Sequence, residues 1–290
     1  MFSPRANIFL AVAATWLIWG STYLAIRISL QDMPPFFMAG SRFLAAGLAL
    51  FGWLLVQRKT LPSMRQWRNV FVLAFLLLVM GHGGVVFAEQ WVASAVAALA
   101  VASMPLWATL FARLFGRRVT LLDLIAISIG FVGVVLLNQD AELRGATLAA
   151  IVLLIAPVSW AFGSVVSGRM DLPGGLMLPA TEMLCGGVQL LAISLFTQEG
   201  LPQQMTFWPT AAWIYQIIAG SIIAFSAYLY LLKHARPALA TSYAFVNPVI
   251  AVALGVTLAG EHMESWGYAG MTIIVAAVAV ITLQRGIKKT

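Results

Sequence analysis

Long uncharged stretches separate the charged residues of this chain. Seven windows contain no Asp, Glu, Lys or Arg: 6–26, 69–88, 90–112, 145–168, 200–232, 237–260 and 265–284. Three more carry one charge each: 33–57 with Arg42, 119–139 with Asp123 and 172–198 with Glu182. A helix that crosses a bilayer needs about 20 mostly apolar residues. Because backbone groups inside a bilayer must be paired within their own segment, each window is expected to be a helix. The sequence therefore predicts an all-α polytopic membrane protein with ten transmembrane helices.

The overall composition argues against a soluble globular protein. Hydrophobic residues make up 61% of the 290 residues and charged residues only 9%, which is too little polar surface to cover a globule in water. The segments between the windows are short, the longest being roughly 57–69. They leave no room for a soluble domain, so we expect the protein to work within the membrane.

The positive charges gather at one side of the predicted bundle. A formal net charge of +7 would by itself suit an anionic partner such as nucleic acid. The bases, however, lie at the chain ends and in the loops of one side: Arg5, Arg58, Lys59, Arg65, Arg68, Arg113, Arg117, Arg118, Arg169, Lys233, Arg236, Arg285, Lys288 and Lys289. The opposite side holds mostly carboxylates. By the positive-inside rule both termini are expected in the cytoplasm, and no nucleic-acid partner is expected.

The chain repeats itself weakly at an offset of about 143 residues. Gly20-Ser21 matches Gly163-Ser164, and Pro105 matches Pro248. At 144 positions two further matches are Pro35 with Pro179 and Gly116 with Gly260. Each half holds five helices, so the second half enters the membrane from the opposite side. We therefore predict two inverted repeats, over 6–139 and 145–285. This is a recurrent transporter design, because two inverted halves allow two nearly equivalent packings that open to opposite sides.

Four runs of sequence resemble the EamA family of drug/metabolite transporters, in particular its YedA-like bacterial inner-membrane branch. They are IWGSTY at 18–23, GSRFLAAG at 40–47, SWAFGS at 159–164 and PALATSYAFVNPV at 237–249. The resemblance extends over roughly 6–285. It implies a ten-helix fold of two inverted EamA repeats in a bacterial inner membrane. It also implies export of metabolites, amino acids or drugs, and a cavity lined by helices 1, 3, 4, 6, 8 and 9.

Three ionisable side chains lie at membrane depth, Arg42, His82 and Glu182, and Glu89 ends a predicted helix. Arg near a helix centre costs about 2.5 to 3.5 kcal/mol on the insertion scale, so Arg42 should have a partner or a wet cavity. It suits an anchor for an anionic substrate group, or a structural arginine bonded to carbonyls or to Glu89. His82, flanked by three glycines, could bind substrate or take part in coupling. Glu182 and Glu89 are candidates for coupling or gating; the alternatives are interhelical bonding for Glu182 and a solvated helix end for Glu89.

Three prolines lie inside predicted helices, at Pro105, Pro157 and Pro248. Each removes a backbone donor and frees the carbonyl four residues earlier. Because Pro105 and Pro248 are repeat-related, we expect paired kinks beside the substrate path. Simple helix bending is the alternative.

The remaining candidates for substrate binding are polar and aromatic side chains. Asn247 follows Tyr243 by four residues, so the two share a helix face near mid-membrane. The other candidates are Trp19, Ser21, Trp107, Trp160 and Ser164. Aromatic walls suit an apolar or aromatic substrate, although Trp and Tyr also collect at membrane interfaces. Hydrogen bonding between helices is the alternative for Asn247.

The sequence shows no signature of several other activities. It has no Walker-type loop of an ATP-driven pump, no metal-ligand spacing and no Ser, His and Asp set for hydrolysis. We expect a small-molecule substrate and membrane lipid as partners, with no cofactor, metal or obligate protein partner. The hypothesis is a secondary transporter that exports small organic metabolites, amino acids or their analogues first, by alternating access around a central cavity. The alternatives are an intramembrane enzyme acting on lipid or polyprenyl substrates, a lipid translocator or a channel.

Overall fold

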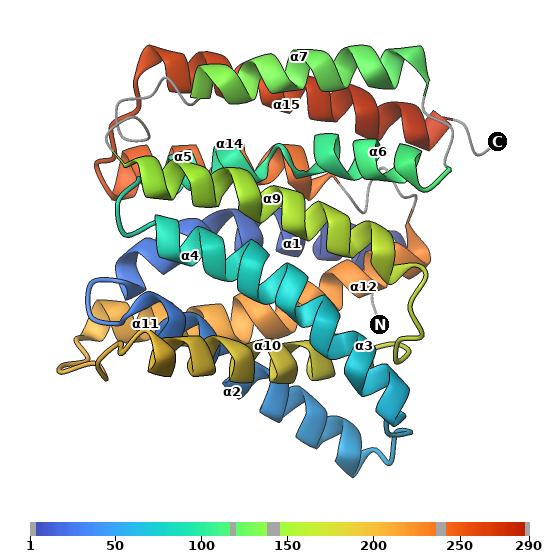
Figure 1. Ribbon diagram of the computed structural model, residues 1–290, viewed down its shortest axis with the longest axis vertical. Helices are drawn as coiled ribbons and strands as arrows, with labels where there is room; N and C mark the ends of the chain where they lie inside the picture. The colour runs from blue at the N-terminus through green and yellow to red at the C-terminus, as the bar shows by residue number, and fades with distance from the viewer. Residues whose placement is uncertain (1–3, 117–119, 138–145, 236–241, 288–290) are drawn as a thin grey trace.

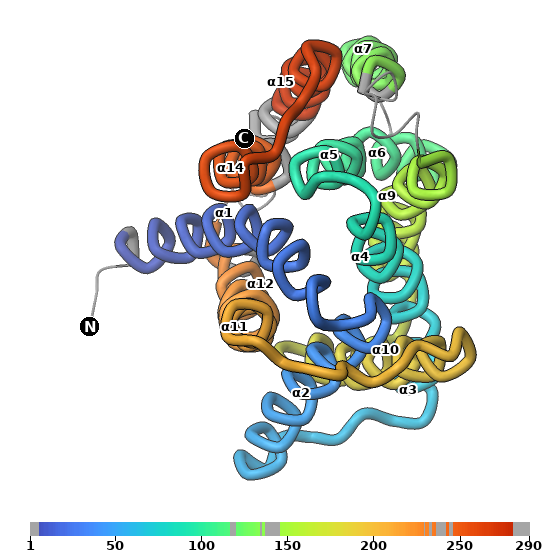
Figure 2. Tube along the Cα trace, turned by 90° about the vertical axis from the view of Figure 1, so that its left-hand side faces the viewer, coloured from blue at the N-terminus to red at the C-terminus, as the bar shows by residue number. Residues whose placement is uncertain are grey.

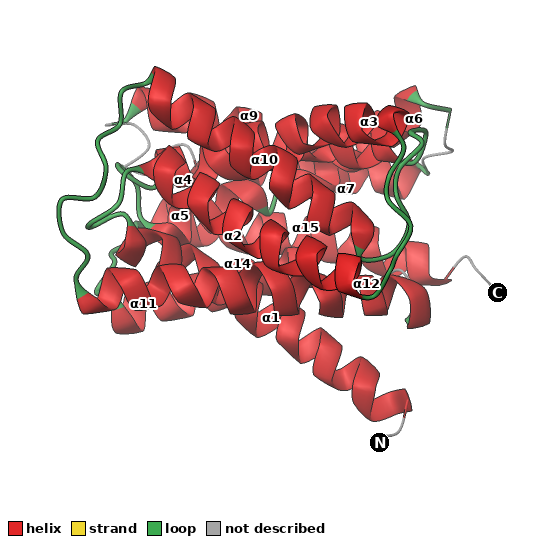
Figure 3. Ribbon diagram, turned by 90° about the horizontal axis from the view of Figure 1, so that it is seen from below, coloured by secondary structure: helices red, strands yellow, loops and turns green. Residues whose placement is uncertain are grey.

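The computed structural model describes residues 4–116, 120–137, 146–235 and 242–287, and every regular element in these ranges is helical (Figures 1 and 3). The first half contains α1 (Pro4–Ser29), α2 (Pro35–Val56), a third span of α3 (Met64–Ala74), η1 (Phe75–Gly83) and α4 (Gly84–Ala88), a fourth span of α5 (Ser94–Val101) and α6 (Met104–Leu114), and α7 (Leu121–Leu137). The second half contains α9 (Thr147–Ser167), α10 (Met177–Phe196), an eighth span of α11 (Phe207–Tyr215), η2 (Gln216–Ile223) and α12 (Ala224–His234), α14 (Tyr243–Leu258) and α15 (Ser265–Ile287).

The prediction of a ten-helix membrane protein is confirmed. Seven helical stretches of the described residues are long and apolar enough to cross a membrane, and shorter apolar helices occupy the fifth, ninth and tenth positions. Successive spans run in alternating directions, so their connections gather at two ends of the bundle (Figure 1). We name the end at which α1 begins the N face, and the end at which α1 finishes the far face. The predicted repeat boundaries at 139 and 145 lie outside the described residues.

Repeat-related glycines end two of the helices. α6 finishes at Leu114 and α14 at Leu258, and the glycine two residues beyond each end has a left-handed backbone, with φ of +82° at Gly116 and +63° at Gly260. Glycine takes this conformation without the strain that a Cβ atom would cause. The matched glycines of the sequence repeat therefore have the same structural task in both halves.

Each half also contains one π-helical stretch in its third span. These stretches begin at Phe75 and Gln216, which are 141 positions apart and so close to the repeat offset. A π-helix inserts an extra residue per turn and is frequent at functional sites. Both stretches stand near the middle of their spans, where they alter which side chains face the centre of the bundle.

The two halves interdigitate instead of forming separate bundles. α2 packs along its repeat counterpart α10, and α7 along its counterpart α15 (Figure 1). α1 packs along α14, and α6 packs along α9. In the repeat, α1 corresponds to α9, and α14 corresponds to the fourth span, which contains α6. The α1–α14 pair is therefore the repeat counterpart of the α9–α6 pair. The packing thus follows an approximate two-fold relation between the halves.

Glycines allow α2 and α10 to approach closely. A Cβ atom added at Gly187 would lie 2.6 Å from the backbone nitrogen of Leu44, and one at Gly47 would lie 2.8 Å from the backbone nitrogen of Leu184. Small residues at a crossing let helices in a membrane pack backbone against backbone. Apolar side chains such as Met38 bury themselves beside this crossing in a hydrophobic cluster.

Candidate functional site

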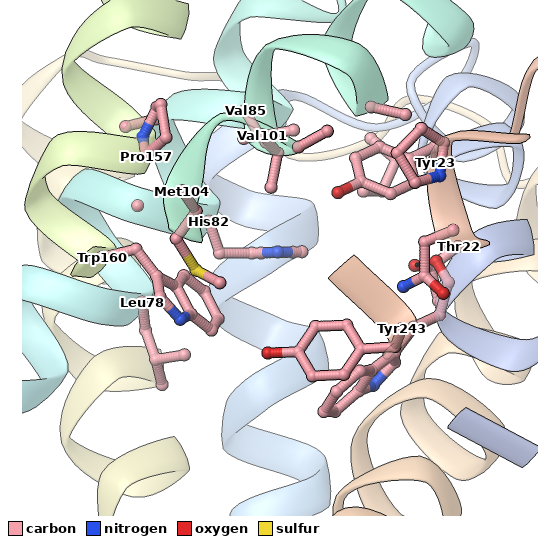
Figure 4. Close-up of a pocket in the computed structure, with 18 of the residues that line it drawn as sticks. Thr22, Tyr23, Leu78, His82, Val85, Val101, Met104, Pro157, Trp160 and Tyr243 are labelled. Atoms are coloured by element: carbon pink, nitrogen blue, oxygen red, sulfur yellow. Dashed lines mark hydrogen bonds between the residues drawn. The ribbon is translucent and has the colours of Figure 1, made fainter. Parts of the chain in front are cut away.

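A central cavity lies where the two halves meet. Its lining residues come from α1, α2, the third and fourth spans, α9, α12 and α14, and its empty space is about 950 Å³, including space open to solvent. Figure 2, which looks along the bundle, shows these helices around a common centre, and Figure 4 shows the side chains. The predicted site residues found in the lining are Trp19, Arg42, His82, Trp160, Tyr243 and Asn247, with the prolines Pro157 and Pro248.

The lining helices differ in one respect from those implied by the family resemblance. All six expected helices contribute, and α2 is a seventh, through Arg42 and Phe43. The first half therefore supplies the cavity's one arginine from a helix that the resemblance did not include.

Aromatic rings form one wall of the cavity. The ring of Trp19 lies 4.9 Å from that of Tyr243 and 5.5 Å from that of Phe225, measured between centroids. The indole nitrogen of Trp19 donates to the carbonyl of Gly220 at 3.1 Å, which fixes the ring. In Figure 4 the hydroxyl of Tyr243 points across the space toward the side where Trp160 and Met104 stand. A flat apolar or aromatic group would be bounded by rings on both sides.

Arg42 is buried, with 3% of its surface exposed, and is held by neutral groups from two other spans. Its Nε donates to the hydroxyl of Ser221 at 3.0 Å, and its Nη1 donates to the side-chain oxygen of Gln216 at 2.9 Å. Nη1 also lies 3.1 Å from Nε2 of His82. Gln216 donates in turn to Ser29 Oγ at 2.9 Å, so its amide oxygen is held toward the guanidinium. The alternative bond to Glu89 is not found.

His82 stands in η1 beside Arg42. A guanidinium nitrogen can only donate, so Nε2 of His82 accepts, and the proton of the neutral ring is on Nδ1. The imidazole meets the ring of Phe43 edge to face at 5.0 Å. Neighbouring Gly81 lets the backbone touch Trp160, because a Cβ atom there would lie 2.8 Å from the indole. The glycine run around His82 thus serves close packing, of Gly81 and Gly84 against α9 and of Gly83 against Leu190 of α10.

Asn247 is buried in α14 and bridges to α1. With its amide nitrogen facing two carbonyls, it donates to the backbone oxygens of Trp16 and Tyr243, both at 3.2 Å. Pro248, next along the helix, also lines the cavity. Asn247 therefore combines an interhelical bond with a place in the lining.

Three predicted binding residues lie away from the cavity lining. The hydroxyl of Ser21 bonds with Tyr215 at 2.7 Å, and that of Ser164, on an exposed face, donates to the carbonyl of Trp160. Trp107 packs edge to face on Phe131, with centroids 4.6 Å apart. All three belong to helices that line the cavity, but none of them is among the lining residues.

The predicted prolines differ in their surroundings. Pro157 lies inside α9 and Pro248 inside α14. Pro105 instead lies at the start of α6, directly after the break at 102–103 that divides the fourth span. A proline fits the first turn of a helix because the missing donor has no partner there.

The two predicted acidic residues are buried outside the cavity lining. Glu182 is 6% exposed in α10, and one of its carboxyl oxygens has no hydrogen-bond partner among the described residues. Glu89 follows Ala88, the last residue of the third span, and is fully buried with neither carboxyl oxygen bonded to a described residue. Burial and then the charge of Glu261 raise the pKa of Glu89 well above its usual range, while Arg27 opposes them. Glu89 is thus not the solvated helix end that was the alternative.

Comparison with known proteins identifies the family. The family model of the EamA-like transporters matches residues 6–139 and 147–283. The chain belongs to the EamA-like transporter family. This membership confirms the resemblance and makes the protein a membrane transporter, not an enzyme.

Individual relatives agree with the EamA membership. The uncharacterised inner membrane transporter YedA of Escherichia coli K12 is 44% identical over 283 residues, which cover 97% of this chain and 92% of YedA. Protein PecM of Dickeya dadantii is 28% identical over 270 residues, covering 91% of this chain and 88% of PecM. A protein of known crystal structure, 21% identical, superposes with a TM-score of 0.65 over 98% of this chain and 99% of its own, which shows a shared fold.

On the far face, carboxylates of this EamA transporter cap helices that are distant in sequence. Glu261 accepts from the backbone nitrogens of Ser94 and Ala95, at 2.9 and 3.1 Å, and so caps α5. Glu199 caps α2 in the same way through two backbone nitrogens, at 3.1 and 2.9 Å. Arg27 donates to the carbonyls of Glu89 and Val92, at 2.7 and 3.1 Å. Helix N-termini favour carboxylates, so these contacts tie the spans together at this face.

Several cavity residues of this EamA transporter were missed from the sequence. Tyr23 lies one helical turn after Trp19, and Phe43 is next to Arg42 in a quoted motif, so position alone could have suggested both. Met104 is the repeat partner of Asn247, so the repeat offset could have suggested it as well. Among the described residues, no three His, Cys, Asp or Glu side chains come together as metal ligands would.

Proposed function

We propose that this EamA transporter is a secondary carrier that exports small organic metabolites by alternating access. The cavity is the main support for this proposal, because its lining helices come from both halves and the helices pack in repeat-related pairs. A site between two inverted halves is exposed to either side when one half rocks against the other. Amino acids or their analogues are the first class of cargo to test.

In this proposal the cavity residues divide into two roles. Trp19, Trp160 and Tyr243 form aromatic walls, and Arg42, His82 and Asn247 supply the polar contacts. Glu89 and Glu182 are proposed for ion coupling or gating, which their burial without full hydrogen bonding supports. Ser21, Trp107 and Ser164 leave the proposed binding set.

We infer a bacterial inner membrane location with the N face in the cytoplasm. The described N-face loops carry Arg58, Lys59 and Arg169, whereas those of the far face carry Asp32 and Glu261. Basic residues favour the cytoplasmic side. The printed description of YedA as an inner membrane transporter supports the same location. A protease site or tag placed in the 57–63 loop should react only from the cytoplasmic side.

The cargo is found by comparing cells with and without the protein. Untargeted analysis of the medium should show one or a few organic compounds that accumulate only when the protein is present. Purified protein in liposomes should then exchange that labelled compound in counterflow without changing it chemically. Conversion to a new product, or no exchange above protein-free liposomes, would contradict the proposal.

Two tryptophans provide a matched test of the cavity. Trp160 lines it, whereas Trp107 packs on Phe131 outside it. Trp160→Ala should lower counterflow at least tenfold at equal protein abundance, and Trp107→Ala should affect abundance or melting temperature more than flux per molecule. Equal losses of flux in both variants would argue against the cavity as the transport route.

A further inference from the structure

The cavity carries a single permanent charge. Among the lining residues that the structure describes, Arg42 is the one that is always ionised, and no Asp or Glu is among them. His82 accepts a hydrogen bond from Arg42 and is therefore neutral in this arrangement. The binding space between the aromatic walls thus has a formal charge of +1.

This charge has no counterion in the part of the chain that the structure describes. Every partner of Arg42 there is neutral: a hydroxyl, an amide oxygen, an imidazole nitrogen and the ring of Phe43 5.0 Å from the guanidinium carbon. Nη2 donates to no described acceptor, although a guanidinium has five N–H groups to satisfy. A buried cation without an opposite charge is costly unless something else neutralises it.

The surroundings hold the guanidinium ready for a ligand. Gln216 and Ser221 come from η2 and His82 from η1, so both π-helical stretches contribute to its position. Gly220, between the two η2 residues, leaves the space that a side chain would take, since a Cβ atom there would lie 3.1 Å from Nη2. An arginine fixed in this way is suited to a planar anion such as a carboxylate.

We propose that the cargo is an organic monoanion with an apolar or aromatic body, bound through its acidic group to Arg42 and through its body to Trp19, Tyr243 and Trp160. This inference rests on the proposed transport function and places organic monoanions ahead of amino acids as the first class of cargo. A monoanion makes the loaded site neutral. A zwitterionic amino acid would bury its ammonium group where no carboxylate receives it, and a cation would add a second positive charge. Both should bind less well than the anion.

Four ligands that share a benzyl group separate these classes: phenylacetate, its isosteric neutral amide phenylacetamide, zwitterionic phenylalanine and cationic phenethylamine. Calorimetric titration of the purified full-length protein in detergent should show phenylacetate binding at least tenfold more tightly than each of the others. Arg42→Gln should remove the difference between phenylacetate and phenylacetamide. Arg169→Gln, which removes an exposed arginine of the N face, should leave the difference unchanged.

The wild-type ligand series decides the inference even where Arg42→Gln fails to fold. Equal binding of acid and amide, tighter binding of phenylalanine or phenethylamine, or no binding of any member would overturn the anion site. Counterflow of labelled phenylacetate, corrected for protein-free liposomes, keeps the transport question separate. Tight binding of phenylacetate without counterflow would leave the anion site standing and contradict carriage. Counterflow of phenylalanine, with no tighter binding of phenylacetate, would support carriage and contradict the anion site.

Discussion

Glu89 provides a sharp test of the far face, because its carboxyl is buried there without a described hydrogen-bond partner. The charged groups that act on it are Glu261 and Arg27, and burial with Glu261 keeps the pKa of Glu89 well above its usual range. Glu89→Gln preserves the shape of the side chain and removes the titration. We expect the wild-type protein to lose stability as the pH rises, and the variant to lose less.

Proton counting gives the sign and size of this effect. An unfolded Glu titrates near pH ~4.3. Between that pH and the raised pKa of the folded Glu89, the unfolded chain has released a proton that the folded state keeps. The folded state then binds one more proton, and the free energy of unfolding falls by at most ~1.4 kcal/mol per pH unit. The contribution is fully present below about pH 4.3 and is lost as the pH rises toward the folded pKa.

Denaturant unfolding in detergent at several pH values upward from about 4.3 measures this slope. The difference in slope between wild type and Glu89→Gln should approach that of one proton. Glu264→Gln, which removes an exposed carboxylate of the same face, should keep the wild-type slope. Parallel pH profiles for wild type and Glu89→Gln would show that Glu89 is already ionised in the folded protein, and the reasoning would fail.

Three other predictions follow from contacts between helices. Gly187→Ala should lower the free energy of unfolding by ~1–3 kcal/mol, because the added Cβ atom collides with the backbone of Leu44. Gly52→Ala, where no atom lies near the added Cβ, should be neutral or stabilising by up to ~1 kcal/mol. A melting assay measures both changes. Glu261→Ala should cost ~1–3 kcal/mol in urea unfolding, because the donors at the start of α5 lose their acceptor. Asn247→Ala should reduce counterflow without reducing membrane abundance; equal loss of both would show that it serves packing alone.

The ten helices could be predicted because the bilayer imposes a length and a polarity that the sequence displays directly. Window 145–168 became α9 at Thr147–Ser167, and window 172–198 became α10 at Met177–Phe196. The π-helical stretches could not be predicted, because nothing in the apolar composition of η1 and η2 distinguishes them from an apolar α-helix. Their hydrogen-bond shift depends on what packs against them, and the sequence does not state that.

Only some residues of the candidate site could be predicted, because many of its contacts join residues that are far apart in the sequence. Arg42 and His82 were visible as polar residues in apolar helices. Their partners were not, because Gln216 and Ser221 lie more than 170 positions from Arg42 and meet it only when α2 packs on η2. Helical spacing identifies neighbours within one helix, whereas the far-face caps and the contacts of Arg42 with Gln216 and Ser221 join helices from opposite halves.

The duplicated scaffold surrounds chemistry that is not duplicated. His82 and Phe225 are 143 positions apart and both line the cavity, and the same holds for Met104 and Asn247. In each pair one half supplies a polar group and the other an apolar one. Arg42 corresponds at this offset to Cys185, which carries no charge at all. The two halves can therefore exchange roles in packing, although the cavity between them has one charged end and one apolar end. A bound ligand should for this reason keep a single orientation through the transport cycle.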